Sequence, residues 1–113
     1  MNDDNLLVNL TGELRRGTQV LAVLSQLFTT QYGYSLLQGL ESKNVLIEAG
    51  TLYPLLRRLE SQGLLISEWD TSESRPRKYY QLSAEGKELY QKLVEEWNTI
   101  VREMDSLIGR DKL

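Results

Sequence analysis

Leucines recur with helical spacing between residues 49 and 62. They stand at i, i+3, i+4 and i+7, so at about 100° per residue they form one stripe that must be buried: Leu52, Leu55, Leu56 and Leu59. Pro54 lacks an N–H and fits best within a first helical turn, which favours a helix start near Gly50 or Thr51. Gly63 is predicted to end this helix in a left-handed conformation.

The polar residues of this helix lie outside the leucine stripe. On a helical wheel Arg57 is nearly opposite the stripe, Thr51 and Arg58 flank it, and Tyr53 stands at its border. Side chains of these types donate hydrogen bonds to DNA phosphates and base edges. The pattern therefore predicts a helix that presents these four residues to double-stranded DNA, with Arg57 as the main groove contact.

A β-hairpin is predicted to follow this helix. Residues 66–70 and 78–82 carry β-branched and aromatic side chains, and residues 71–74 have the composition of a turn. The polar loop is expected to hold Arg75, Arg77 and Lys78, whose three positive charges suit a phosphate backbone or a minor groove. A loop whose charges serve only solubility is the alternative, but the preceding helix favours DNA.

A first helix is predicted from Thr11, which is expected to cap it. The residues of its apolar face are Leu14, Leu21, Leu24 and Phe28. Arg15 and Arg16 lie outside this face, where contact with DNA and simple solvation are both open.

A second helix is predicted from Ser35 to Leu40, after a break at Tyr32 and Gly33. Tyr32, Tyr34 and Ser35 lie near its N-terminus, where backbone N–H groups and hydroxyls can hold a DNA phosphate. Packing is the alternative role for the tyrosines.

The most regular apolar pattern belongs to a last helix, predicted from Ala84 to Ile108 with Ser83 as its cap. At 1.5 Å per residue it is about 38 Å long, more than a domain of this size can cover. A second copy of the chain is the simplest partner that could bury the remaining apolar surface of this helix. The predicted homodimer interface comprises Leu93, Trp97, Ile100, Val101, Met104 and Leu107.

Composition narrows the function further. The 113 residues include no cysteine and no histidine, which excludes disulfides, Ser-His triads and most zinc chemistry. No paired carboxylates in a cleft-like context and no cofactor loop are visible. The sequence therefore predicts a single domain that is not an enzyme and that binds no metal ion or cofactor.

The distribution of charged residues along the chain is consistent with DNA binding by the predicted helix and hairpin. The formal net charge is −3, but residues 1–50 carry 3 positive and 5 negative charges, residues 51–80 carry 5 and 4, and residues 81–113 carry 5 and 7. Only the middle segment, with the predicted helix and hairpin, is net positive. No apolar run approaches the ~20 residues that span a bilayer, so we expect a cytoplasmic protein without membrane contact.

Three motifs in order resemble one family. Residues 32–34 read Tyr-Gly-Tyr, residues 50–60 read GTLYPLLRRLE, and residues 77–83 read RKYYQLS. Together they closely resemble the PadR-like transcriptional regulators, over about Leu14 to Leu107. Ser83 stands where the family usually has Thr, and either hydroxyl can cap the next helix.

The resemblance implies a mainly α fold with a small β-hairpin. It comprises a winged helix-turn-helix DNA-binding domain over residues 1–82 and a C-terminal dimerisation helix over residues 83–113, in one compact unit. It also implies repression, and a planar aromatic effector held between the C-terminal helices near Trp97, for which interface packing is the alternative role. A homodimeric repressor on an inverted-repeat operator is the function this favours. A winged-helix protein-interaction module without DNA binding is the alternative.

Overall fold

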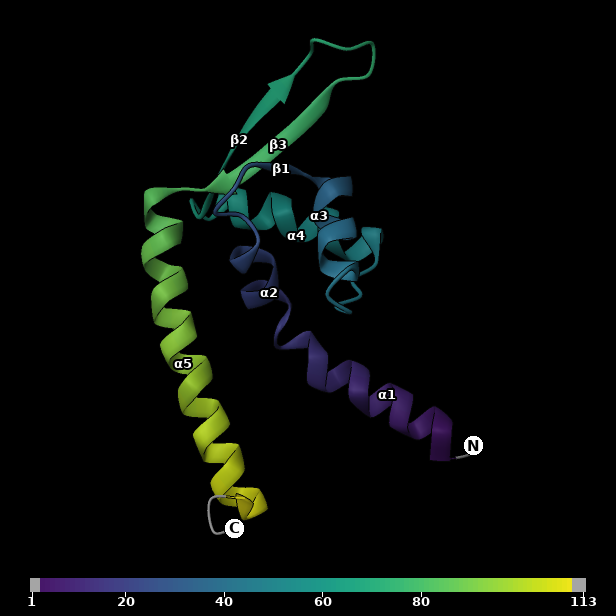
Figure 1. Cartoon of the computed structure of the whole chain (residues 1–113), viewed down its shortest axis with the longest axis vertical. Helices are drawn as coiled ribbons and strands as arrows, with labels where there is room; N and C mark the ends of the chain where they lie inside the picture. The colour runs from purple at the N-terminus through teal and green to yellow at the C-terminus, as the bar shows by residue number, and fades with distance from the viewer. Residues whose placement is uncertain (1–2, 111–113) are drawn as a thin grey trace.

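The computed structural model describes residues 3–110, which form five helices and a three-stranded sheet (Figure 1). The first half contains α1 (Asp3–Arg16), α2 (Gln19–Ser25), β1 (Gln31–Tyr32) and α3 (Gly33–Glu41). The second half contains α4 (Ala49–Ser61), β2 (Leu65–Asp70), β3 (Arg77–Leu82) and α5 (Ala84–Ile108). The mainly α fold with a β-hairpin that the sequence predicts is confirmed.

The hydrophobic core lies between α2, α3, α4 and the base of the sheet. The antiparallel strands have the order β1-β3-β2, and β1 is a short third strand that the sequence pattern does not predict. The leucine stripe of α4 is fully internal, as expected from its spacing. The buried residues of the core are Val23, Leu24, Leu27, Leu36, Leu40, Leu52, Leu55, Leu56, Leu59, Leu65, Tyr80 and Leu82.

The end of α4 is tied to the start of α5. Gly63 has φ 81°, as predicted, and hydrogen bonds from the Gly63 N–H to Glu60 O and from the Leu64 N–H to Leu59 O close the helix in a Schellman motif. Ser83 caps α5 by accepting the Gly86 N–H at 2.9 Å, and its hydroxyl donates to Gly63 O at 2.6 Å. This double role fixes where α5 leaves the core.

Two predicted boundaries need correction. Helix α4 begins at Ala49, so Pro54 lies in its second turn, where the missing N–H leaves the Gly50 carbonyl without its usual helical partner. Strand β3 begins at Arg77, one residue before the predicted strand of residues 78–82, so Arg77 joins Lys78 in the strand and, of the three cations, only Arg75 remains in the loop. Pairing of Asp70 with Arg77 across the hairpin extends the ladder into the segment that the polar composition assigned to the loop.

The predicted first helix is wrong in its extent. The chain is helical from Asp3, and a break at Gly17 and Thr18 separates α1 from α2. Thr11 is therefore inside α1 and caps nothing. Both residues at the break are weak helix formers, and Thr18 turns its hydroxyl and N–H back to Arg15 O.

The break divides the apolar face that the spacing predicted. Leu24 is fully buried in α2, whereas Leu14 in α1 is 76% exposed. Phe28 lies beyond the end of α2, half-exposed, and its ring is nearly perpendicular to that of Tyr90 in α5, with 5.1 Å between the ring centroids. A continuous periodicity cannot reveal a change in helix direction.

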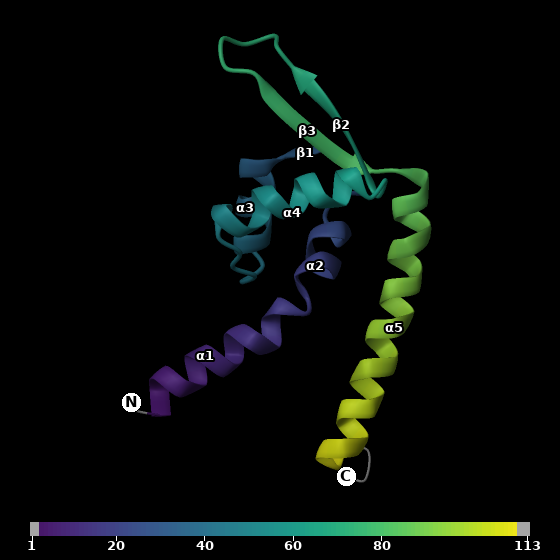
Figure 2. The same cartoon turned by 180° about the vertical axis from the view of Figure 1, so that it is seen from behind.

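Helices α1 and α5 project away from the core, as two views of the molecule show (Figures 1 and 2). The Cα radius of gyration is 16.8 Å, against about 13 Å for a compact domain of 100 residues. No residue of α1 is buried, and in α5 only Gly86 in the first turn is. Across residues 3–110, no helix is both long enough and apolar enough to cross a membrane.

Candidate nucleic-acid interface

The exposed side of α4 carries the residues that the helical wheel assigned to it. Thr51, Arg57 and Arg58 are exposed, and Tyr53 is 38% exposed at the border of the buried stripe. The four buried leucines fix the rotation of α4 about its axis. The polar side chains are thereby held in a constant direction relative to the core.

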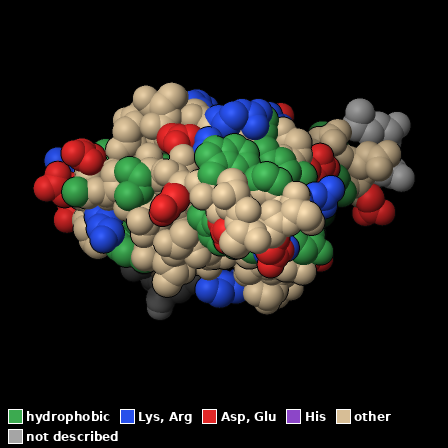
Figure 3. Space-filling model, turned by 90° about the horizontal axis from the view of Figure 1, so that it is seen from above, with side chains coloured by type: hydrophobic (Ala, Val, Ile, Leu, Met, Phe, Trp, Pro, Cys, Tyr) green, Lys and Arg blue, Asp and Glu red, His purple; other side chains and the backbone are tan. Residues whose placement is uncertain are grey.

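A hollow opens between the hairpin, the start of α3 and α4. The side chains that line it include five residues predicted to contact DNA, Tyr32, Tyr53, Arg75, Arg77 and Lys78, together with Tyr34, Trp69, Pro76 and Tyr80. Seen from above, apolar side chains gather next to Lys and Arg side chains (Figure 3). Aromatic rings and guanidinium groups from three separate segments therefore meet on one surface.

Arg77 is held by aromatic side chains on the outer face of β3. Its guanidinium carbon lies 4.6 Å from the centroid of the Tyr32 ring, and the Tyr32 ring meets Tyr79 edge-on at 5.4 Å between centroids. A hydrogen bond with the Tyr79 side chain, and then the electrostatic interaction with the Tyr32 side chain, raise the pKa of Arg77 above its ordinary value. The cation is thus oriented before any ligand arrives.

Gly33 permits the close approach of α3 and α4 at this hollow. A Cβ atom at this position would overlap the ring of Tyr53. The Tyr53 ring occupies the space that a side chain at position 33 would take. The Tyr-Gly-Tyr motif therefore has a packing reason as well as a surface role.

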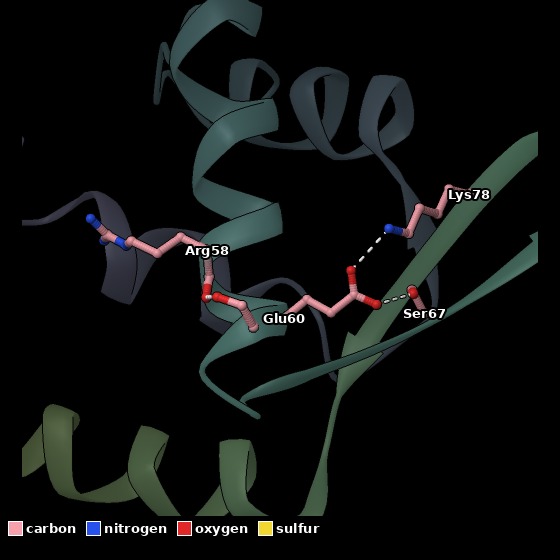
Figure 4. A network of polar contacts seen from close by, with 5 residues as sticks. Arg58, Glu60, Ser67 and Lys78 are labelled. Carbon is pink, nitrogen blue, oxygen red and sulfur yellow. Dashed lines mark hydrogen bonds and ion pairs between the residues drawn. The ribbon is translucent and has the colours of Figure 1, made fainter.

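Lys78 is not free in the hollow. Its Nζ donates to Glu60 Oε1 at 2.9 Å, and Ser67 donates its hydroxyl to Glu60 Oε2 (Figure 4). The hydrogen bonds from Ser67 and then Lys78 lower the pKa of Glu60, and the bond to Glu60 raises the pKa of Lys78. Both groups are therefore charged near neutral pH, and Lys78 already has an anionic partner.

The other predicted contacts are divided between two places. The Ser35 hydroxyl donates to Tyr32 O at 2.9 Å at the start of α3. Thr51 and Arg58 line a second hollow on the side of α4 away from the hairpin, together with Arg16. Figure 4 shows Arg58 pointing away from the Glu60–Lys78 pair. Arg57 lines neither of these two hollows.

The predicted dimer face of α5 is largely uncovered in the single chain. Leu93 is partly buried against the core, but Trp97 is 41% exposed. The remaining members of this face, Ile100, Val101, Met104 and Leu107, are exposed as well. A second exposed apolar face lies on α1 and comprises Leu6, Leu7, Leu10 and Leu14.

Sequence reasoning missed several residues at this surface. Trp69 and Pro76 line the first hollow, and Glu60 accepts hydrogen bonds from both Ser67 and Lys78. Strict alternation offered a signal for part of this: Ser67 and Trp69 share one face of β2, and Lys78 and Tyr80 are their partners across the hairpin. The link to Glu60 joins residues 18 positions apart and needs the tertiary structure.

Comparison with known proteins gives consistent matches. Residues 20–92 match the transcriptional regulator PadR-like family. A transcriptional regulator of Mycobacterium tuberculosis is 39% identical over 56 residues, which cover 50% of this chain and 52% of that protein. The chain thus spans about half the length of that curated relative.

Solved structures extend the likeness to nearly the whole chain. A PadR family transcriptional regulator from Eggerthella lenta is 47% identical with a TM-score of 0.90, over 93% of this chain and 94% of that one. A PadR family regulator from Clostridium difficile is 29% identical with a TM-score of 0.67, over 80% and 94%. A transcriptional regulator from Clostridium thermocellum is 28% identical with a TM-score of 0.76, over 83% and 93%.

Proposed function

Because the chain belongs to the PadR-like family of transcriptional regulators, which are not enzymes, we propose that it is a homodimeric repressor of an inverted-repeat operator. The observation that carries DNA binding is the surface beside α4. There Tyr32, Tyr53, Arg75 and Arg77 line one hollow next to an exposed helix face. Guanidinium groups and aromatic hydroxyls are the donors that phosphates and base edges accept from.

The two parts of this surface have different roles in the proposal. Helix α4 enters the major groove, with Arg57 as the first groove contact and Thr51, Tyr53 and Arg58 beside it. Arg75 and Arg77 on the hairpin, which is the wing of the fold, hold the phosphate backbone or the minor groove. Tyr32 and Ser35, near the start of α3, contact the same DNA phosphate backbone.

Dimerisation accounts for the apolar surface that one chain leaves exposed. The α5 face around Trp97 and the α1 face from Leu6 to Leu14 are both too large to remain in water. A second chain related by a two-fold axis buries both faces at once, because α1 and α5 of one protomer then pack against α1 and α5 of the other. The dimer then sets two copies of α4 about 34 Å apart, one turn of DNA.

The salt dependence of DNA binding tests this proposal. Affinity for duplex DNA is expected to fall steeply with added salt, and Arg75→Ala with Arg77→Ala should flatten the slope by up to about two phosphate contacts. Glu73→Gln, in the same loop, is the control that changes charge without removing a cation. Absence of DNA binding at low salt would instead support the winged-helix protein-interaction module.

The effector part of the proposal rests on Trp97. Its ring is 41% exposed in the middle of the α5 face, so a planar aromatic molecule between two α5 helices can stack on it. In a Trp69→Phe protein, in which Trp97 is the only tryptophan, such compounds are expected to quench emission and to weaken operator binding by the same factor that DNA weakens theirs. A broad panel without either effect would leave Trp97 as an interface anchor.

A further inference from the structure

Glu60 links the last turn of α4 to both strands of the wing. Its two carboxylate oxygens accept from different strands, Oε2 from Ser67 on β2 and Oε1 from Lys78 on β3, the latter at 2.9 Å (Figure 4). The side chains of Glu60 and Lys78 are 30% and 27% exposed, so water screens the pair only in part. Within residues 3–110 it is the only salt bridge.

The position of this network along the wing is distinctive. At the base of the hairpin, Leu65, Tyr80 and Leu82 are buried in the core. Residues 68–77 are all exposed, and Ser67 and Lys78 are the half-buried residues that precede and follow them. Glu60 is therefore the outermost point at which α4 holds the hairpin, before the exposed part that carries Arg75 and Arg77.

A carboxylate at this place is unexpected on electrostatic grounds alone. A negative charge beside a surface that binds phosphates lowers affinity by repulsion. Its partner Lys78 has one of its three donors engaged by Glu60, and its charge is neutralised by that contact. As a pair, the two residues contribute almost no net attraction for DNA, so any contribution to binding has to come through geometry.

We propose that Glu60 and Lys78 are positioning residues that, together with Ser67, hold the wing at a fixed angle to α4. The acidic side chain of Glu60 thereby strengthens DNA binding. Lys78 is then not a phosphate contact. This inference rests on the proposed function for its effect on DNA. The clamp itself, Glu60–Ser67–Lys78, is a structural claim that is tested without DNA.

Affinity and salt slope together separate positioning from direct contact. Glu60→Gln removes a charge from the clamp, and Glu68→Gln removes the same charge from the exposed residue on β2 that neighbours Ser67. We expect Glu60→Gln to weaken duplex binding about two- to fivefold, a range set by the coupling of a partly exposed ion pair. Glu68→Gln is expected to leave affinity unchanged or raise it.

Lys78 variants provide the complementary measurement. Lys78→Met is expected to weaken binding as Glu60→Gln does, with an unchanged slope of log affinity against log salt, whereas Arg75→Ala flattens that slope. Lys78→Arg keeps a cation for Glu60, so it should retain the affinity that Lys78→Met loses. A flattened slope in Lys78→Met, or an affinity gain in Glu60→Gln equal to that in Glu68→Gln, overturns the proposal.

A charge exchange and a DNA-free readout complete the test. The double variant Glu60→Lys with Lys78→Glu should recover most of the affinity lost in either single variant, and failure to recover any would count against the clamp. Trp69 pairs with Lys78 across the hairpin, so in a Trp97→Phe protein its emission reports the wing directly. Altered Trp69 emission in Glu60→Gln and Lys78→Met, absent in Glu68→Gln, supports the clamp even if the wild-type protein binds no DNA.

Discussion

The winged helix and the two projecting helices use the same residue type in opposite surroundings. Leu24 and Leu56 are completely buried, whereas Leu14 and Leu107 are 76% and 80% exposed, and all four lie on apolar helix faces. The two groups of leucines differ in whether another part of the same chain packs against their helix face. Residues 19–82 fold back on themselves and bury most of their leucines in one core, while α1 and the second half of α5 leave that core without a neighbour from the same chain. Apolar periodicity shows that a face needs cover, but not which surface covers it.

Removal of the uncovered part of α5 is expected to have the largest effect. Deletion of residues 95–113 keeps Tyr90 and Leu93, which pack on the core, and removes most of the exposed apolar face. The product should stay folded but sediment as a monomer, and operator affinity should fall at least about 100-fold because one half-site contact remains. Deletion of residues 110–113 alone leaves α5 whole and is the control. A dimer that survives the longer deletion would place the interface elsewhere.

A pair of leucine substitutions sharpens the same comparison. In the chain that ends at residue 94, Leu56→Ala should lower the free energy of unfolding by about 2–5 kcal/mol, since it empties space in the core. Leu14→Ala in the same chain should change it by less than about 0.5 kcal/mol, as for other exposed positions. Urea unfolding measures both values. Similar losses would mean that α1 packs within its own protomer.

Arg57 tests whether the exposed face of α4 acts apart from the core. Arg57→Ala should weaken operator binding by roughly 1–3 kcal/mol while the unfolding transition stays unchanged, because the side chain lies opposite the buried stripe. Ser61→Ala, on the same exposed face, is a matched control of small expected effect. Unchanged operator affinity in Arg57→Ala would remove this residue from the interface.

The smallest expected effect is the pH dependence of the clamp. The pKa of Glu60 is lowered from 4.5, so its stabilisation is present above 4.5 and is lost as pH falls through the lowered value. The pKa of Lys78 is raised from 10.5, so its stabilisation is present below 10.5 and is lost as pH rises through the raised value. The stability difference between wild type and Glu60→Gln should therefore be constant between these limits, at about 0.5–1 kcal/mol. A difference that persists unchanged at pH values below the lowered pKa of Glu60 would assign it to packing.

The hairpin illustrates how far the sequence predicts the candidate site. The exposed residues of α4 follow from the leucine spacing, and Arg75 in the loop follows from composition. Strand β1 was missed because two residues are too short for a periodic signal, although Tyr32 there stacks under Arg77. The sequence predicts Lys78 as a contact to the phosphate backbone or a minor groove, and its bond to Glu60 arises only when α4 and the hairpin are brought together.

By itself, the sequence determined the leucine stripe of α4, the cap at Ser83, the extent of α5 from Ala84 to Ile108 and the left-handed Gly63. These features depend on spacing and on backbone preferences within a few residues. The tertiary structure alone decided the break between α1 and α2, the third strand and the partner of Lys78. Each of these depends on which distant segments meet, and the relative directions of helices and strands are set by packing across the whole core.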